Sequence, residues 1–590
     1  MTSAKNARTA EERRFTSFDG MELFYRHWPA LSEKARGAIV LFHRGHEHSG
    51  RVAHLVRELG LDDFAFFAWD ARGNGMSPGK RGDAPGVEAA VRDVDCFIRH
   101  ISREHGHDSR DMLVLAQSVG AVYVSAWAHD YAPRIRGLIL GSPAFKVKLY
   151  VPFARQLLRL LLKLRGNFFV NSYVKARFLT HDSERIASFK EDPLIARPIS
   201  ARILSGLFDT ADRIVADAGA IDLPVQLFIS GSDWVVHKWP QHLFFNRLTH
   251  PLNERHLLPG FYHDTFGELD REKVYVPMRA FINRLFAADY QEQDLSRADR
   301  IGPSAAERKR LEAPMPPCSP MRPLYAGLRL CLWLFSRCSG GARIGRETGF
   351  DSGSMLDYVY RNTPTGSNFL GRAFDKWYLN GPGWSGIRVR KAQVEELMGL
   401  AASLLREKGM PVRVMDIAAG HGRYILDALA AMPGDWESAV LRDTSTLNVE
   451  KGQALIAERG LADKVSFVIG DAFSEESISA QQPQPSLAVV SGLYELFQDN
   501  DMLAESLRGL ARALPEGGCF VYTNQPWHPQ QELIARCLGS HRQGEPWIMR
   551  CRSQAEMDQL VRRAGFSKIE QRLDPNGIFT VSLAVRCARH

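Results

Sequence analysis

The sequence predicts two α/β domains in one chain, each built on a largely parallel sheet with helices between its strands. Its 590 residues far exceed the roughly 250–300 residues at which a single hydrophobic core stops growing. Short apolar runs alternate with helical stretches on both sides of a charged, Pro-rich segment, and such runs suit strands buried on both faces. We therefore expect a first domain over residues 1–287, a linker over 288–346 and a second domain over 347–590.

The composition is that of a globular protein, with 45% hydrophobic and 24% charged residues. A formal net charge of +8 favours anionic partners in general but identifies neither nucleic acid nor membrane. The second half lacks a concentrated basic patch with interleaved aromatic residues, so we do not expect a nucleic-acid partner.

The eight cysteines form no close CxxC pair and no Cys/His spacing suited to zinc, which predicts free thiols in a reducing compartment and no metal. Met1 to Phe15 lack the apolar core of a secretory signal. No apolar run reaches the roughly 18–20 residues that span a bilayer. We expect a cytoplasmic protein with, at most, peripheral contact at the inner face of the membrane.

In the first domain, the strand-like apolar runs lie at 38–42, 64–69, 112–115, 138–140 and 225–229. The third run leads into Ala116-Gln-Ser118-Val-Gly120, a strand, a tight turn with small residues around a serine, and the start of a helix. This pattern is typical of a nucleophile elbow, in which a strained turn exposes the serine hydroxyl. Ala116 replaces the first glycine of the usual pattern.

An acid and a histidine should follow such a serine at later strand ends. Asp233 follows the apolar run that ends at Ile229, and His263 ends a later segment that begins at Leu257. His263 would take the proton of Ser118, and Asp233 would orient the imidazole and stabilise its cation. The rival histidines His237, His250 and His256 lack the Gly-Phe-Tyr-His-Asp context of His263. Asp264, the last residue of that motif, is expected to be a neighbour of the catalytic residues and not the catalytic acid.

An oxyanion hole requires backbone N–H groups, one from Val119 after the serine and one from the turn after an early strand. That turn is His43-Arg-Gly-His-Glu-His-Ser-Gly-Arg51. Together with Asp70-Ala-Arg-Gly-Asn-Gly-Met-Ser and Gly260-Phe-Tyr-His263, it resembles the monoacylglycerol lipase and lysophospholipase group of α/β-hydrolases. The resemblance implies the α/β-hydrolase fold with a helical cap at about 146–215, Gly45 as second oxyanion donor, and a glycerol ester or lysophospholipid as substrate. Arg44 stands where that group has glycine.

Two segments are basic and amphipathic. In residues 150–165, Phe153, Leu157, Leu160, Leu161 and Leu164 follow helical spacing, with Arg155, Arg159 and Lys163 on another stripe. Residues 322–338 of the linker have a similar character. Each segment suits either a membrane interface or packing within the protein.

The second domain has strand candidates at 412–416, 438–443, 465–469, 487–490 and 519–522. The first ends at Asp416 and runs into a loop that contains Ala418, Gly420 and Gly422, where the backbone can approach a nucleotide at a helix N-terminus. The second ends at Asp443, where a carboxylate can accept both ribose hydroxyls. Asp471 follows the third.

These features together resemble the class I S-adenosylmethionine methyltransferases, which have a Rossmann-like fold. The resemblance covers about residues 350–590. It implies S-adenosyl-L-methionine as the cofactor, with Asp416 and the glycine loop near the methionine part, Asp443 on the ribose, and Asp471 with Ala472 near the adenine.

The methyl acceptor is less clearly marked. Tyr494 and Glu495 follow the fourth strand, where contacts to the acceptor or cofactor usually gather, and are the candidates for contact with the acceptor. Asn524-Gln-Pro-Trp527 is similar to a motif of amino-group methyltransferases but follows the fifth strand, so we assign it no role.

The main functional hypothesis is a bifunctional enzyme of lipid metabolism, with a serine ester hydrolase and a methyltransferase in one chain. Two alternatives stay open. The halves could act on unrelated small molecules, or the second could be a non-catalytic S-adenosylmethionine-binding module that regulates the hydrolase.

Overall fold

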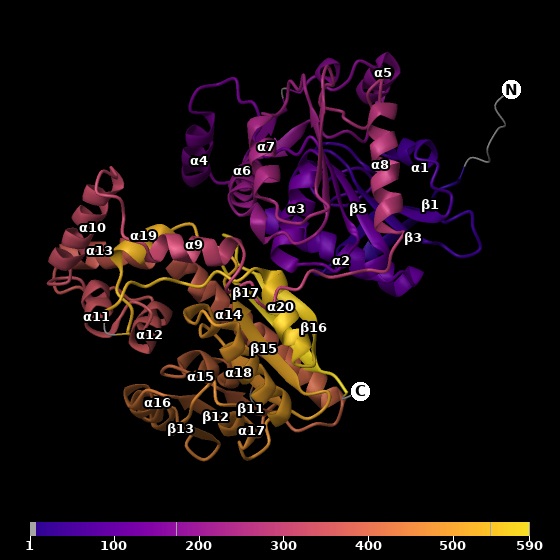
Figure 1. Ribbon diagram of the computed structural model, residues 1–590. Helices are drawn as coiled ribbons and strands as arrows, with labels where there is room; N and C mark the ends of the chain where they lie inside the picture. The colour runs from indigo at the N-terminus through magenta and orange to yellow at the C-terminus, as the bar shows by residue number, and fades with distance from the viewer. Residues whose placement is uncertain (1–7, 173, 433, 543, 589–590) are drawn as a thin grey trace. The chain divides into compact units, whose positions relative to one another are not determined.

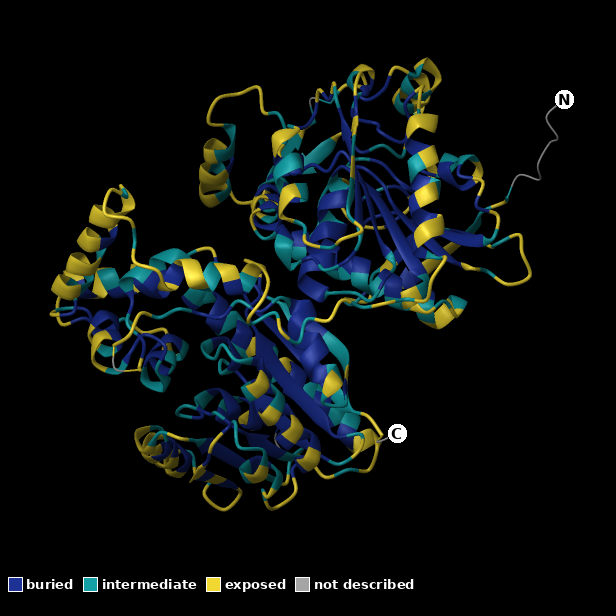
Figure 2. Cartoon of the chain, viewed as in Figure 1, coloured by how far each residue is buried: buried dark blue, intermediate teal, exposed yellow. Residues whose placement is uncertain are grey.

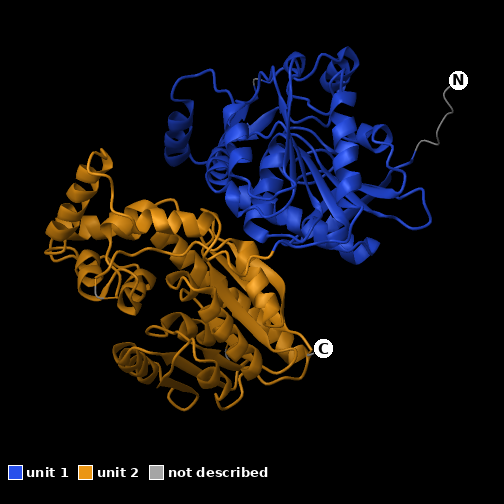
Figure 3. Ribbon diagram, in the orientation of Figure 1, with its two compact units in different colours: residues 1–293 blue, residues 294–590 orange. Residues whose placement is uncertain are grey.

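The computed structural model describes residues 8–172, 174–432, 434–542 and 544–588. The chain divides into two compact units, residues 1–293 and 294–590 (Figure 3). Both combine a central sheet with helices (Figure 1). The central strands and most of their covering helical faces are buried, whereas the strands at the sheet edges are partly exposed and several outer helices are largely exposed (Figure 2).

The first unit contains an eight-stranded sheet. Its strands are β1 (Glu11–Thr16), β2 (Glu22–Trp28), β3 (Gly37–Phe42), β4 (Phe64–Trp69), β5 (Met112–Gln117), β6 (Gly137–Gly141), β9 (Val225–Ser230) and β10 (Glu254–Leu258). The order across the sheet is β1-β2-β4-β3-β5-β6-β9-β10. The pairs that β2 forms are antiparallel, and all others are parallel.

Helices cover both faces of this sheet. They are α1 (His54–Glu58), α2 (Val87–His105), α3 (Val119–Tyr131), α6 (Ala201–Ala216), α7 (Trp239–Arg247) and α8 (Glu272–Leu285). Val40 and Val114 pack with residues of α2, α3 and α6, whereas Ile39 and Leu113 pack with residues of α1 and α8. Neighbouring residues of a strand thus enter opposite cores, because strand side chains alternate between faces.

The chain between β6 and β9 forms the expected cap. It contains α4 (Ala154–Arg165), β7 (Phe169–Asn171), α5 (Ser183–Glu191), β8 (Pro198–Ser200) and α6, with β7 and β8 paired as a small antiparallel sheet. Leu158 of α4 packs with Ala201 and Phe208 of α6.

The second unit contains a seven-stranded sheet. Its strands are β11 (Arg413–Asp416), β12 (Ser438–Asp443), β13 (Val465–Ile469), β14 (Leu487–Val490), β15 (Cys519–Asn524), β16 (Phe566–Leu573) and β17 (Thr580–Arg586). The order is β13-β12-β11-β14-β15-β17-β16, and β17 runs antiparallel to both of its neighbours.

The helices of this unit are α9 (Pro303–Glu312), α10 (Met321–Phe335), α11 (Gly340–Thr348), α12 (Gly353–Arg361), α13 (Phe369–Leu379), α14 (Pro382–Glu407), α15 (Arg423–Ala430), α16 (Thr446–Glu458), α17 (Glu475–Ser479), α18 (Asn500–Ala513), α19 (Gln531–Cys537) and α20 (Gln554–Arg563). Residues of α14, α15 and α16 cover one face of the sheet. Residues of α17, α18 and α20 cover the other.

The domain boundary differs from the expectation in one respect. Residues 294–346 are not a separate linker, since they contain α9, α10 and α11 and belong to the second unit. Buried contacts explain this, because Leu311 of α9 and Tyr325 of α10 are each less than 10% exposed.

With one exception, the expected strands are present, with small changes at their ends. The strand expected to end in His263 instead ends at Leu258, and His263 lies in the following loop. Within the described residues, no helix is long and apolar enough to cross a membrane.

Candidate active sites

Ser118 lies at the sharp turn between β5 and α3. Its backbone has φ 54° and ψ −116°, a region that residues with a Cβ rarely adopt. Gly120 allows α3 to approach β3 closely, because a Cβ there would lie 2.4 Å from the backbone oxygen of His43. The predicted nucleophile elbow is therefore formed, with Ala116 fully buried in β5.

The three predicted catalytic side chains meet in a hydrogen-bonded chain. His263 Nε2 lies 2.8 Å from Ser118 Oγ, and His263 Nδ1 lies 2.8 Å from Asp233 Oδ2. All three residues are at most 5% exposed. With Nδ1–H donated to the carboxylate, Nε2 is left as the acceptor for the serine hydroxyl.

Asp233 is held as a carboxylate by its surroundings. Its other oxygen, Oδ1, accepts the backbone N–H groups of Val235 at 2.7 Å and Val236 at 2.9 Å. Burial alone would raise the pKa of Asp233, but His263 and the two backbone donors outweigh burial and lower it.

Two backbone amides are available for an oxyanion. Gly45 and Val119 both line the cavity next to Ser118. Neither amide donates a hydrogen bond to another described residue. Gly45 packs closely on Val119, since a Cβ at Gly45 would lie 2.9 Å from Val119 Cγ2.

Arg44, the departure from the family pattern, is buried under this loop. Its guanidinium pairs with Glu47 at 2.5 Å and lies 3.4 Å from Asp264. Asp264 also binds Arg185 of the cap at 2.8 Å. Burial would raise the pKa of Asp264, but the two arginines outweigh burial and lower it. Asp264 is therefore a carboxylate that binds arginines, and it is not part of the hydrogen-bonded chain.

The cavity above Ser118 has a volume of about 680 Å³ and an apolar interior. Its apolar lining includes Val147, Leu149, Leu179, Phe189, Ile199, Leu204, Leu207 and Phe208. Four exposed cations also line it, Lys175, Arg177, Lys190 and Arg197. None of the four forms an ion pair with a described residue.

Helix α4 presents its apolar stripe to solvent. Phe153, Leu157, Leu160 and Leu164 are 79%, 51%, 52% and 72% exposed. Two arginines of the helix instead face α6, where Arg155 pairs with Asp209 and Asp212 and Arg159 pairs with Asp209. The salt bridges and Leu158 thus attach α4 to α6, and they leave the apolar residues of the stripe exposed.

In the second unit, the loop after β11 borders a cavity of about 710 Å³. Gly420 and Gly422 both have positive φ, 58° and 74°. A Cβ at Gly422 would lie 2.6 Å from Leu441 Cδ1, so glycine is needed for the loop to lie against β12. Ala418, Gly420 and Gly422, the predicted cofactor residues of this loop, all line the cavity.

The carboxylates at the next two strand ends also line this cavity. Asp443 Oδ2 accepts the N–H of Gly420 at 2.9 Å, and Asp443 Oδ1 accepts from Ser445 and Asn448. Asp471 is exposed, and Ala472 beside it is buried. Altogether the lining contains the acidic residues Glu347, Asp351, Asp357, Asp443 and Asp471 but only one arginine, Arg423. Such a cavity favours a cationic ligand.

Asp416 is the predicted cofactor residue that does not line the cavity. It is fully buried at the end of β11, where one oxygen accepts the Tyr424 hydroxyl and the other accepts the N–H of Ala418 at 3.1 Å. Burial raises the pKa of Asp416 to about 7. Asp416 therefore stabilises the start of the loop through its hydrogen bond to Ala418, from the buried side of the loop.

The two acceptor candidates point in different directions. Tyr494 lies in the hydrophobic core, with its hydroxyl 2.9 Å from Ser506 Oγ, and it lines neither cavity. Glu495 lines a third cavity, next to the one just described. Asn524 is bound within the protein, since its amide donates to Arg552 and Gln554.

Sequence reasoning missed His528, which lies in a loop four residues after β15 and lines the third cavity. Its local sequence carries no catalytic motif. Arg390 of α14, for which the sequence predicted no role, forms a buried ion pair of 2.7 Å with Glu495.

Comparison with known proteins decides the family. Residues 278–586, more than half of the chain, match the family described as "Putative methyltransferase". The chain belongs to this family. The uncharacterized protein YnbC of Escherichia coli (strain K12) is 56% identical over 582 residues, which cover 99% of each chain.

Residues 33–270 match a second family, described as "Serine aminopeptidase, S33". A monoacylglycerol lipase of Mycolicibacterium smegmatis is 25% identical and aligns with 46% of this chain and 97% of its own. The phospholipase YtpA of Bacillus subtilis is 24% identical over 44% of this chain and 99% of its own. A solved monoacylglycerol lipase of Paleococcus ferrophilus aligns with 45% of this chain and 99% of its own, at 27% identity and a TM-score of 0.41.

The chain therefore joins a lipase-like α/β-hydrolase domain to a methyltransferase-family domain. This organisation confirms the fold class and the family resemblance that the sequence predicted.

Proposed function

We propose that the chain carries two activities, serine ester hydrolysis at Ser118 and S-adenosylmethionine-dependent methyl transfer in the second unit. The observation that carries the first is the hydrogen-bonded chain from Ser118 through His263 to Asp233, buried at the base of an apolar cavity.

In the proposed hydrolysis, His263 Nε2 takes the hydroxyl proton while Ser118 Oγ attacks the ester carbonyl. The free amides of Gly45 and Val119 donate to the oxyanion that develops on the carbonyl oxygen. His263 then protonates the leaving alcohol, and the same imidazole activates a water that releases the acid. Asp233 stabilises the imidazolium in both steps.

We propose a lysophospholipid in preference to a neutral monoacylglycerol as substrate. An apolar cavity of about 680 Å³ suits a single acyl chain. Four cations at the cavity form no ion pair with a described residue and suit a phosphate group: Lys175, Arg177, Lys190 and Arg197. The similarity to both a monoacylglycerol lipase and a phospholipase is compatible with either substrate.

Hydrolysis of palmitoyl-lysophosphatidylglycerol and of monopalmitoylglycerol by purified full-length protein tests both points. Ser118→Ala should abolish both reactions, because removal of a nucleophile costs on the order of 10⁶-fold in kcat. Replacing Lys175 and Arg177 together by glutamine should lower kcat/KM at least about tenfold for the lysophospholipid and leave the neutral ester unchanged. Equal loss on both substrates, or faster turnover of the neutral ester by wild type, would reject the headgroup assignment.

For the second unit, we propose that S-adenosyl-L-methionine binds in the cavity of about 710 Å³. The acidic lining suits its sulfonium and ammonium charges, and the glycines of the loop permit close approach of its amino acid part. Asp443 is placed to accept the ribose hydroxyls, and Asp471, with the buried Ala472, would border the adenine. The bound molecule supplies an electrophilic methyl group; the protein's part is to orient it and exclude water.

Binding of the radiolabelled cofactor in equilibrium dialysis tests this assignment. Asp443→Ala should weaken binding at least about 100-fold. The substitution removes the carboxylate that would accept the ribose hydroxyls, and with it the hydrogen bond that holds the N–H of Gly420. Asp463→Ala replaces another aspartate of the second unit, one that does not line this cavity, and serves as the control. Unchanged binding by Asp443→Ala would exclude the assignment, and no binding by wild type would exclude the cofactor.

We further propose that α4 docks on the inner surface of the membrane. Its four exposed apolar side chains would enter the acyl region, and Lys163 and Arg165 at its end would meet anionic headgroups. Residues 322–338 are a second proposed contact, since Leu324, Leu330 and Trp333 of α10 are 42–56% exposed. A cytoplasmic location is part of this proposal, and the eight free cysteines support it.

Sedimentation with anionic phosphatidylglycerol vesicles measures this docking. Replacing Leu157 and Leu160 by glutamate should reduce bound protein at least about tenfold, while cleavage of a short, soluble ester continues. Leu31→Glu alters an equally exposed leucine, 57% exposed in the loop after β2, and should bind like wild type. Full binding by the α4 variant would contradict the proposal.

The two activities are proposed to act on related lipids. Incubation with labelled S-adenosylmethionine and a membrane lipid extract should place label in a lipid, and Asp443→Ala should abolish it. Label only in water-soluble material would favour two unrelated reactions. Cofactor binding without any methyl transfer, but with a changed rate of ester hydrolysis, would favour the regulatory module.

A further inference from the structure

A large apolar cavity of about 960 Å³ lies beside the proposed cofactor site in the second unit. The two cavities share four lining residues, Asp351, Leu356, Gly492 and Leu496. Residues of α10, α13, α14 and α19 form most of its wall. A molecule in this cavity would therefore be able to present one end to a methyl group held next door.

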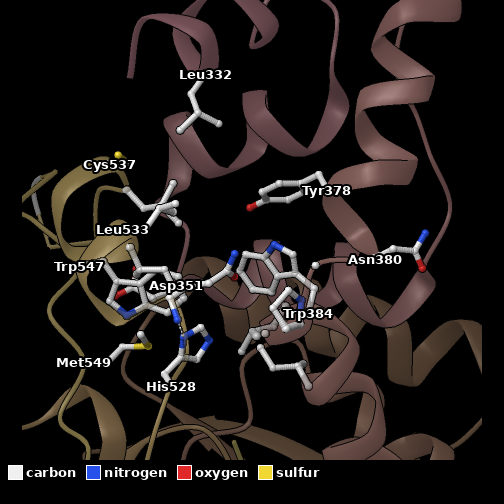
Figure 4. A pocket seen from close by; sticks show the side chains of 18 of the residues that line it. Leu332, Asp351, Tyr378, Asn380, Trp384, His528, Leu533, Cys537, Trp547 and Met549 are labelled. Atoms are coloured by element: carbon white, nitrogen blue, oxygen red, sulfur yellow. Dashed lines mark hydrogen bonds between the residues drawn. The ribbon is translucent and has the colours of Figure 1, made fainter. Parts of the chain in front are cut away.

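The wall is rich in aromatic and aliphatic side chains. Trp384 and Trp547 stack at 6.1 Å between ring centroids, and Tyr378 lies 5.5 Å from Trp384. Figure 4 shows Trp384, Trp547 and His528 gathered at one end of the cavity and Leu332 at the other. Such a lining favours an apolar ligand.

A carboxylate at this cavity has an unused oxygen. Glu495 is 5% exposed, and its Oε1 accepts from Arg390 at 2.7 Å. Its Oε2 is buried without a hydrogen-bond partner among the described residues. An unpaired buried acceptor is costly, so a ligand that donates a hydrogen bond to Oε2 would be stabilised there.

His528 supplies a hydrogen-bond donor at the same cavity, where Glu495 supplies an acceptor. Its Nδ1 accepts the backbone N–H of Gln530 at 3.0 Å, and burial lowers its pKa to about 4. A neutral imidazole whose Nδ1 is an acceptor carries its proton on Nε2. His528 therefore presents an N–H donor at neutral pH and cannot accept a proton at that nitrogen.

The entrance to the cavity is also apolar. Trp377 lines it and is 72% exposed, next to the exposed Lys376 on α13. Cys331 of α10 also lines the cavity and is exposed. The exposed leucines and Trp333 of α10 lie on the same helix, so an amphiphile could enter from a lipid phase.

We propose that this cavity binds the methyl acceptor, and that the acceptor is an apolar molecule with one acidic hydroxyl group, phenolic or enolic. A hydroxyl can donate to Glu495 Oε2 and accept from His528 Nε2–H while keeping a lone pair for attack. An amine has only one lone pair, so it cannot both accept from His528 and attack the methyl carbon, and a carboxylate has no proton to donate to Glu495 Oε2. The inference rests on the methyl transfer proposed above.

The atoms of the transfer balance with these two residues. A lone pair of the hydroxyl oxygen forms the bond to the methyl carbon, and the carbon–sulfur bond breaks with its electron pair left on sulfur. The hydroxyl proton passes to Glu495 Oε2 and then to water. A carboxylate can accept this proton more readily from a phenol than from an alkyl alcohol, because the phenol is far more acidic. His528 holds the oxygen in line and is a positioning residue.

Binding and transfer are measured separately with 4-octylphenol as probe. Quenching of tryptophan fluorescence reports binding to the full-length protein without cofactor, because two tryptophans stack in the wall and a third lies at the entrance. Label from S-adenosylmethionine in the ether product reports transfer. Octanol and octylamine serve as matched probes that lack an acidic hydroxyl. Cofactor binding by dialysis reports folding of the unit and the proposed function independently.

We expect wild type to bind 4-octylphenol and to methylate it much faster than octanol or octylamine. Glu495→Gln should reduce transfer at least about 100-fold and change probe affinity less than about tenfold. His528→Phe should mainly raise KM. Glu532→Gln changes a glutamate on α19 that does not line the cavity and should leave both measurements unchanged.

Three results would overturn the inference while cofactor binding is normal. They are no quenching by 4-octylphenol in wild type, methylation of octylamine as fast as that of the phenol, and full transfer by Glu495→Gln. If wild type fails to bind the cofactor, the proposed methyl transfer itself is rejected. If only Glu495→Gln loses cofactor binding, Glu495→Asp replaces it: a shorter carboxylate should keep a low but measurable rate.

Discussion

At the scale of single residues, Asp233 divides its two oxygens between different partners. One oxygen accepts from His263, and the other accepts two backbone N–H groups. The backbone donors fix the carboxylate, so that the imidazole can adopt only the tautomer in which Nε2 faces Ser118.

Asp233→Asn should therefore preserve the fold and reduce ester hydrolysis about 10⁴-fold in kcat, because an amide favours the wrong tautomer of His263. Steady-state kinetics on a short, soluble ester measure the loss. Asp264→Asn, which affects the neighbouring structural carboxylate, should affect stability more than kcat. A decrease in kcat of less than tenfold for Asp233→Asn would argue against the role of Asp233 in orienting His263.

Asp416 gives a pH prediction for the second unit. Its pKa is raised to about 7 by burial, whereas in an unfolded chain it is about 3.9. The folded state thus binds more protons between these values, and its stability falls as pH rises through that range, by up to about 1.4 kcal/mol per pH unit. Asp416→Asn removes this effect.

Urea unfolding of wild type and Asp416→Asn at pH 5 and pH 8 tests the prediction. The free energy of unfolding of the variant minus that of wild type should be larger at pH 8 than at pH 5. The same difference at both pH values would mean that Asp416 is ionised in the folded protein throughout.

There is a common physical reason why some site residues could be predicted from the sequence and others could not. Ser118, Asp233 and His263 could be predicted because the order and spacing of strands place them at one sheet edge. Tyr494 and Glu495 are adjacent, yet one enters the core and the other lines a cavity, and no local pattern distinguishes these directions. His528 depends on the path of a loop, which only tertiary contacts define.

At the scale of elements, the buried parallel strands could be predicted from continuous apolar runs. The strands at the sheet edges could not, because β1 and β16 are partly exposed and carry mixed polar sequences. The direction in which α4 faces also needed the structure. Its arginines pair with Asp209 and Asp212, which lie about 50 residues away in sequence.

The packing of α3 against β3 makes a further prediction. Gly120→Ala would place a methyl group 2.4 Å from the backbone oxygen of His43, which cannot move without disturbing the strand. We expect a loss of about 1–3 kcal/mol in unfolding free energy and a clear decrease in kcat, because Val119 shifts with the helix. Gly399→Ala, in open space within helix α14, is the matched control and should not lose stability. Normal stability and activity of Gly120→Ala would contradict the close packing.

At the scale of the whole molecule, each unit has its own sheet and its own cores. We therefore expect two transitions in calorimetry of the full-length protein. S-adenosylhomocysteine at 100 times its Kd should stabilise only one of them, by about 2.7 kcal/mol. Ser118→Ala should show the same ligand effect. A single transition that moves as a whole would instead show that the units unfold together.

The backbone of Ser118 also has a thermodynamic consequence. A residue with a Cβ in this region of φ and ψ costs about 1–3 kcal/mol, which glycine would not. Ser118→Gly should therefore be at least as stable as Ser118→Ala, although glycine has the more flexible unfolded chain. Without selection for hydrolysis, glycine would be the easier residue to keep at this turn. The side chain that supplies the nucleophile at position 118 therefore lowers the stability of the fold.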